Sequence, residues 1–175
     1  METSATFVRE LTVRADHGQI YIYSLAATNN DDAWETSENV YLDALEDATS
    51  SRRFVGVAGG LVDLMTPGQW NWETPMRVEV WNGEPAADAG WDHEVDVDLD
   101  IPDGQLHFDA SGGSGSVRVE VPAGMYRARV AGRGFTALGV SGDNATDEYR
   151  LRLWPRTVDS DPKLRIAWPG WADYR

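Results

Sequence analysis

Residues 91–102 read WDHEVDVDLDIP, and this stretch decides the fold class. Apolar and acidic side chains alternate along it, and successive side chains of a β-strand point to opposite faces of a sheet. We therefore predict a strand with one buried face, formed by Val95, Val97 and their neighbours at alternate positions, and one face in water. The carboxylates on the outward face are Glu94, Asp96, Asp98 and Asp100.

The segments that follow repeat this alternation. Pro102, Asp103 and Gly104 form a turn before QLHFDAS at 105–111, so we expect this segment to pair with the acidic strand as a hairpin. Arginines occupy the outward positions of the later strands: Arg118, Arg127, Arg129, Arg150 and Arg152. These arginines offer an alternative to a solvated acidic face, since neighbouring strands can neutralise the carboxylates. We predict one common core for Val95, Val97, Leu99, Phe108, Val119, Tyr126, Leu151 and Leu153.

The first half of the chain is less regular, but it also favours strands. Residues 6–16 and 19–27 predict two strands that turn at Asp16–Gly18, and residues 75–83 predict another. FVGVAGGLVDLM at 54–65 is interrupted by two glycines, which indicates two short strands or one bulged strand. SENVYLDALEDATS at 37–50 is the one helix candidate, with Ser37 as its N-cap. Its expected apolar face contains Val40, Leu42 and Leu45.

About nine strands with one short helix, and no alternation of strands and helices, predict an all-β fold. The expected architecture is an antiparallel β-sandwich or jelly roll. The chain has 175 residues, a usual length for one domain, and shows no linker or internal repeat. We therefore expect residues 1–175 to form a single domain.

The excess of acidic residues limits the kinds of partner that the protein can bind. The chain has 29 Asp and Glu against 15 Lys and Arg, a net charge of −14. Such a surface repels nucleic acid and anionic membranes, whereas a basic protein suits it. The same charge also improves solubility, so it does not require a partner. No apolar run is long enough for a signal peptide or a membrane span, and we expect a cytoplasmic protein.

No motif predicts catalysis, a cofactor or a metal site. The chain has no Cys, which excludes a disulfide framework and a cysteine nucleophile. His17, His93 and His107 have no recognised metal spacing, although His93 and His107 would approach each other across the predicted hairpin. The acidic loops 28–39 and 141–148 carry oxygen ligands that suit calcium, but neither has EF-hand spacing, and turns select the same residues.

Tryptophan is abundant, with eight residues of this type. Trp70 and Trp72 alternate with polar residues in GQWNWETP at 68–75, so both rings share one side if the segment is extended. Exposed tryptophans anchor protein partners or sugar rings. The alternative is that these rings pack at the edges of the sandwich.

The segment from Trp91 to Pro155 combines the acidic strand, the turn VPAGMY and a late LRLWP strand. It resembles small bacterial β-sandwich proteins of the competence protein J type, in which a proline, glycine and tyrosine turn opens a late core strand. The resemblance covers residues 91–175 and does not extend to the first 90 residues. It implies a non-enzymatic protein that inhibits a partner such as a nuclease, but it carries over no individual functional residue.

These observations favour an acidic interaction module, such as an inhibitor or immunity protein, that binds a basic nuclease or toxin. Its expected binding residues are Glu94, Asp96, Asp98, Asp100, Trp70 and Trp72. The alternative is a carbohydrate-binding or calcium-dependent β-sandwich module, and an enzyme ranks third. A flat acidic patch would favour the first class, a tryptophan platform beside a cation the second, and a deep polar pocket the third.

Overall fold

Strand β6 (His93–Ile101) has two faces with different surroundings. Its apolar side chains point into the core, where Val95 and Val97 are completely buried. Strand β9 (Gly124–Arg133) pairs with it antiparallel from end to end. Apolar residues of the two strands therefore lie opposite each other on the inner face, and on the outer face Asp96 lies opposite Arg129 and Asp98 opposite Arg127.

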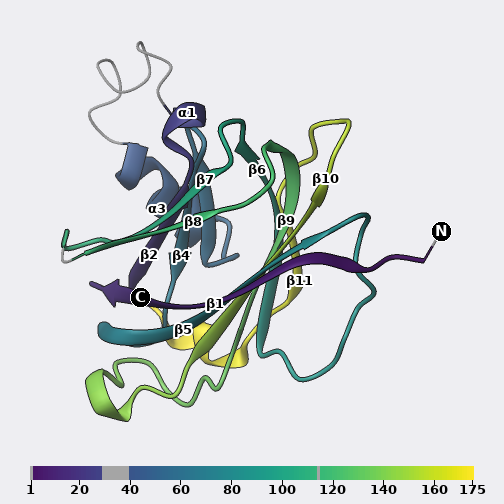
Figure 1. Cartoon of the computed structure of the whole chain (residues 1–175). Coiled ribbons are helices and arrows are strands. Elements are labelled where there is room, and N and C mark those ends of the chain that lie inside the picture. Colours follow the sequence, from purple (N-terminus) through teal and green to yellow (C-terminus); the bar gives the residue numbers. More distant parts are fainter. Residues whose placement is uncertain (1, 29–39, 114) are drawn as a thin grey trace.

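The computed structural model describes residues 2–28, 40–113 and 115–175 (Figure 1). Within these residues, eleven strands and two short helices confirm the predicted all-β class. The other strands are β1 (Ala5–Asp16), β2 (Gln19–Tyr23), β3 (Val55–Ala58), β4 (Leu61–Met65), β5 (Trp70–Trp81), β7 (Gln105–Ala110), β8 (Ser116–Glu120), β10 (Glu148–Pro155) and β11 (Lys163–Ile166). The helices are α1 (Leu25–Thr28) and α3 (Val40–Ser50), with 3-10 turns η1 (Gly142–Asn144) and η2 (Pro169–Asp173).

Backbone hydrogen bonds join the strands into one sheet that folds over into two layers around a common core. The first layer has the order β11-β6-β9-β10-β5-β1, and the second has the order β8-β7-β2-β4-β3. The layers are connected at the β1–β2 corner, where Asp16 lies opposite Gln19. Figure 1 shows β2, β4, β7 and β8 gathered apart from β6, β9 and β10.

The expected antiparallel pairing holds for the described strand pairs except that of β5 and β10. Strand β10 pairs antiparallel with β9 but parallel with β5, where Tyr149 lies opposite Met76 and Leu153 opposite Val80. A parallel pair needs a long connection between its strands, and here residues 82–147 supply it. This connection places β10 between β9, the strand directly before it, and β5, a strand made much earlier in the chain.

The predicted hairpin of β6 and β7 is also wrong. β6 pairs with β9 and β11, whereas β7 pairs with β2 and β8. The turn at 102–104 forms as expected, with the Gly104 N–H donating to the Ile101 carbonyl and Gly104 at a φ of 73°. It carries the chain from one layer to the other. A turn fixes a reversal of direction, but it does not fix which strand becomes the neighbour.

The predicted core is confirmed. All eight residues expected to share it are buried in one cluster to which both layers contribute. The glycine-interrupted segment at 54–65 forms two short strands, β3 and β4, which pair as a hairpin.

Helix α3 forms, but with a different buried face from the one predicted. Val40, Ala44 and Ala48 are buried at spacings of four residues, whereas Leu42 is 59% exposed. Gly56 explains the choice of small residues, because a Cβ there would lie 1.8 Å from the Ala44 carbonyl oxygen. The helix backbone rests directly on β3, so only alanines fit at the contact. The proposed N-cap Ser37 lies outside the described residues.

Candidate functional site

The carboxylate ladder of β6 does not face solvent as expected. Glu94 is 3% exposed and Asp96 is 4% exposed, although both point away from the core as the alternation predicts. Asp98 and Asp100 are half-buried. Alternation therefore assigned the face correctly, and the expectation that this face is in water is wrong for two of the four residues.

Arg129 of β9 is the reason that Asp96 tolerates burial. Its Nε lies 2.7 Å from one Asp96 oxygen and its Nη2 lies 3.0 Å from the other, a bidentate pair. Glu84 accepts a further hydrogen bond from Arg129, at 2.9 Å. Burial would lower the pKa of the Arg129 guanidinium, but the hydrogen bonds of Asp96 and Glu84 outweigh this effect and raise it. Arg129 therefore keeps its positive charge inside the protein.

The other ladder residues have similar partners. Glu94 lies 3.6 Å from Arg129 and 3.7 Å from Arg152, and burial raises its pKa against the lowering effect of both arginines. Asp98 accepts from Arg127 at 2.8 Å, and Asp100 accepts from Arg156 at 2.7 Å. The structure thus has the internal neutralisation that the sequence offered as an alternative.

Two chain segments cover this face. The carbonyls of Pro85 and Ala86 accept hydrogen bonds from Arg129 and Arg152, and the Ser160 N–H donates to Asp98 at 2.8 Å. The buried Glu94 and Asp96 are therefore poorly placed to meet a partner. Partner binding by all four ladder residues, including the half-buried Asp98 and Asp100, stays a prediction.

Trp70 and Trp72 are exposed, as the hypothesis of a binding role requires. They are 42% and 39% exposed, and their rings stack at a centroid distance of 5.5 Å and an interplanar angle of 26°. They lie at the start of β5 beside a cleft of about 550 Å³. The cleft, called the tryptophan groove below, is lined by β5 residues between 70 and 75 and by loop residues between 142 and 147.

Local backbone structure fixes both walls of the tryptophan groove. The Gly139 N–H donates to the Pro67 carbonyl, and the Gln69 N–H donates to the Ser141 hydroxyl, each at 2.9 Å. Gly142 has a φ of 63°, and a Cβ there would lie 2.3 Å from a ring carbon of Trp70. The loop is therefore held against the strand, and glycine is required where the indole meets the loop.

A β-bulge aims the β5 wall outward. Thr74 pairs with Val13 and Asn71 with Ala15, so Trp72 and Glu73 together oppose the single residue Arg14. Strand β10 pairs with β5 only from Met76 onward. On the side away from β1, the segment 70–75 therefore borders the 142–147 loop instead of β10.

Two exposed carboxylates lie in the tryptophan groove, on Glu73 and Asp143. Neither takes part in an ion pair within the described part of the chain. Across 2–28, 40–113 and 115–175, no three His, Asp or Glu side chains are grouped so that they could hold a metal ion. The acidic loop at 28–39, apart from Thr28, lies outside the described residues.

The histidines do not form a pair. His93 is buried and bonds the Arg53 carbonyl at 2.5 Å through Nε2, while its Nδ1 accepts from the Trp168 N–H at 3.2 Å. His107 stacks on Tyr23 in the other layer, at 5.3 Å. The two rings lie apart because β6 and β7 are not neighbours.

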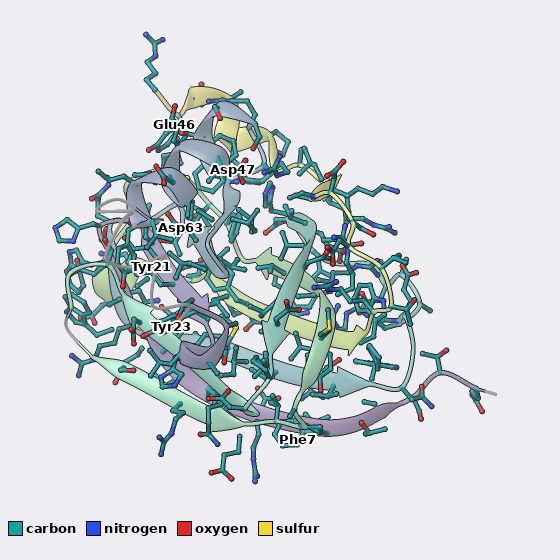
Figure 2. All side chains as sticks on the ribbon, turned by 90° about the horizontal axis from the view of Figure 1, so that it is seen from above. Phe7, Tyr21, Tyr23, Glu46, Asp47 and Asp63 are labelled. Atoms are coloured by element: carbon teal, nitrogen blue, oxygen red, sulfur yellow. The ribbon has the colours of Figure 1, made fainter. Side chains whose placement is uncertain are left out.

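Asp63 is a buried acidic residue that the sequence analysis missed. It lies on β4 opposite Tyr21, and Figure 2 shows it between Tyr21 and Asp47 of the covering helix. It is fully buried, and neither carboxylate oxygen has a hydrogen-bond partner within the described residues. Burial raises its pKa to about 8. A single acid in the apolar segment LVDLM was the available signal.

Comparison with known proteins supports the fold but identifies no functional residue. No family model matches the chain, and no curated protein sequence matches it. Among solved structures, ComJ from Bacillus subtilis, described as an inhibitor of the DNA degrading activity of NucA, is similar with a TM-score of 0.54 and 13% identity. The match covers 89% of this chain and 100% of ComJ. A protein described as crocagin biosynthetic gene J has a TM-score of 0.50 and 16% identity, over 90% of this chain and 100% of its own.

The resemblance seen in residues 91–175 is therefore confirmed at the level of the fold, and it extends to most of the first half as well. No helix in the described residues has the length and apolar character needed to cross a membrane. The chain has the fold of the ComJ type.

Proposed function

We propose that this protein is a non-enzymatic inhibitor, with residues 1–175 acting as one domain in the cytoplasm, that binds a basic protein such as a nuclease or toxin. The observation that carries the proposal is the fold shared with ComJ, which is described as a nuclease inhibitor. A shared fold alone does not fix a function, so the surface must also suit the role.

The distribution of charge supports this role. The arginines of β9 and β10 are engaged by acidic residues of the same face, such as Asp88, Asp96 and Asp98. The net charge of −14 is therefore carried largely by carboxylates elsewhere. An acidic surface attracts a basic partner over a distance and accelerates association.

The test begins with the source organism. Immobilised protein is exposed to its cell extract, retained proteins are eluted with salt and identified, and each basic enzyme is then produced and assayed with increasing amounts of this chain. We expect one enzyme to lose activity with an endpoint at equal molar amounts. The proposal fails if every retained enzyme keeps its activity at a large excess of the chain.

A carbohydrate-binding module is the second candidate, and the exposure of Trp70 and Trp72 favours it. Glycan arrays would detect it directly, since binding should disappear when both tryptophans are replaced.

A further inference from the structure

We infer that the tryptophan groove binds an arginine side chain of the basic partner. Its guanidinium group lies against the Trp70–Trp72 pair, and its charge faces Glu73 and Asp143. This inference rests on the proposed function and adds the place and the chemical group that are recognised.

The first argument is the exposed aromatic pair. Large aromatic side chains at the rim of a cleft are typical anchors of protein interfaces, where tryptophan and arginine are both enriched. Cations prefer the face of tryptophan to that of other aromatic residues. The molecule already contains one such contact, because the guanidinium carbon of Arg14 lies 6.0 Å from the Trp72 ring centre. The remaining exposed ring surface borders the groove.

The second argument is the charge of the groove. Elsewhere on the first layer, the arginines of β9 and β10 meet acidic partners, as Arg127 meets Asp98. Glu73 and Asp143 line the cleft without an ion pair within the described residues. Asp147, on the same wall, is bonded to the Tyr149 hydroxyl at 2.6 Å and leaves the other two carboxylates to a ligand. Among the described residues, the two carboxylates of Glu73 and Asp143 therefore line the groove without a counter-charge.

Arginine fits better than lysine or a sugar. A guanidinium is planar, stacks on aromatic rings and donates to two carboxylates at once, whereas a lysine ammonium is a strongly hydrated point charge. The stacking of Trp70 on Trp72 means that each ring covers part of the other. The pair thus offers a small exposed area of ring face beside two carboxylates, not the broad flat surface that a chain of sugar rings would cover.

The test uses three acetylated and amidated peptides with the sequence GXGXG, in which X is arginine, lysine or citrulline. Citrulline keeps the planar shape of arginine without its charge. The protein is labelled with ¹⁵N, and the indole N–H signals of Trp70 and Trp72 are followed by NMR during each titration. We expect the arginine peptide to shift both signals, the lysine peptide to bind several-fold more weakly, and citrulline to cause no shift.

Two double variants, each with two negative charges fewer than the wild type, show where the peptide binds. Glu73→Gln with Asp143→Asn removes two charges from the groove, while Asp43→Asn with Glu46→Gln removes two exposed charges from α3. We expect the first pair to weaken arginine-peptide binding roughly tenfold and the second to leave it within about twofold, because exposed charges are screened within about 10 Å. Equal weakening by both pairs, equal shifts with citrulline, or shifts of these indoles by cellotriose without any by arginine would overturn the inference.

A third double variant and the peptide titration separate this inference from the proposed function. If Trp70→Leu with Trp72→Leu inhibits the partner enzyme as well as the wild-type protein does, the groove assignment is wrong while the inhibitor function stands. If the arginine peptide binds the groove but no enzyme is inhibited, the groove assignment holds and the inhibitor function is wrong.

Discussion

At the scale of single residues, Asp63 is an acidic side chain whose buried surroundings disfavour its negative charge. Its pKa is raised by burial from the ordinary 3.8 to about 8, so the folded protein holds this proton more tightly than the unfolded chain does. The stability associated with the neutral acid is complete below pH 3.8 and is lost as the pH rises toward about 8. The loss amounts to at most about 1.4 kcal/mol for each pH unit.

Asp63→Asn should remove this dependence, because an amide stays neutral. We expect the variant to unfold at a higher urea concentration than wild type at pH 9 and to differ little from it at pH 4. Asp43→Asn on the exposed side of α3 is the matched control and should keep the wild-type dependence. If Asp63→Asn is equally destabilised at both values, an undetected partner holds the carboxylate.

His93 has the opposite pH dependence. Its Nδ1 accepts the Trp168 N–H, so a second proton cannot be added without breaking that bond. Burial lowers the pKa of His93 from its ordinary 6.5, so the neutral form stabilises the fold, and this stability is lost as the pH falls below 6.5. We expect a lower melting temperature at pH 5 than at pH 7. His93→Gln should melt lower than wild type at pH 7 with a smaller further loss at pH 5, and an undiminished loss would assign the effect to other groups.

At the scale of elements, the paired face of β6 and β9 depends on Arg129. Arg129→Met should destabilise the protein by about 3 to 5 kcal/mol, because it leaves the buried carboxylates of Asp96 and Glu94 without their main counter-charge. Arg127→Met is the comparison, since its partner Asp98 is partly exposed and the expected loss is about 1 kcal/mol or less. Both losses are measured by denaturant unfolding. Equal losses would mean that the depth of burial does not set the strength of these pairs.

At the same scale, some features of the strands could be predicted from the sequence and others could not. Period two identified the later strands and their inward faces because it depends only on the geometry of a single strand. The alternation does not show whether the outward face meets water or another segment of the chain. The prediction that Glu94 and Asp96 lie in solvent is therefore wrong, because residues 84–86 and 160 cover that face. The outward arginines were the better signal, since a row of cations opposite a row of acids indicates pairing. The order of the strands could not be predicted, because the turn at 102–104 is compatible both with a hairpin and with a connection from one layer to the other.

The candidate site was only half predictable for a related reason. Trp70 and Trp72 lie two apart in the sequence, so an extended strand was enough to bring them together. Asp143 and Gly142 reach the same place through the docking of a distant loop, and no local pattern reports such a contact.

At the scale of the whole molecule, ion pairs and excess charge should respond differently to salt. Buried pairs such as Arg129 and Asp96 are screened little, whereas repulsion among exposed carboxylates is screened strongly. We therefore expect the melting temperature to rise by roughly 2 to 5 °C between 50 mM and 500 mM NaCl as the repulsion of a net −14 is relieved. Differential scanning calorimetry gives the measurement. A fall over this range would show that exposed ion pairs, such as Arg133 with Glu148, dominate instead.

The position of β10 has a consequence for how the protein is made. This strand lies between β9 and β5 in the first layer, yet it leaves the ribosome after both of them. Until it emerges, the β5 edge and the β9 edge that it will join both have unpaired backbone groups, and such edges can recruit other chains. A nascent chain therefore has an open sheet until residues 148–155 have been made, and only then can β5 and β9 be joined into one layer.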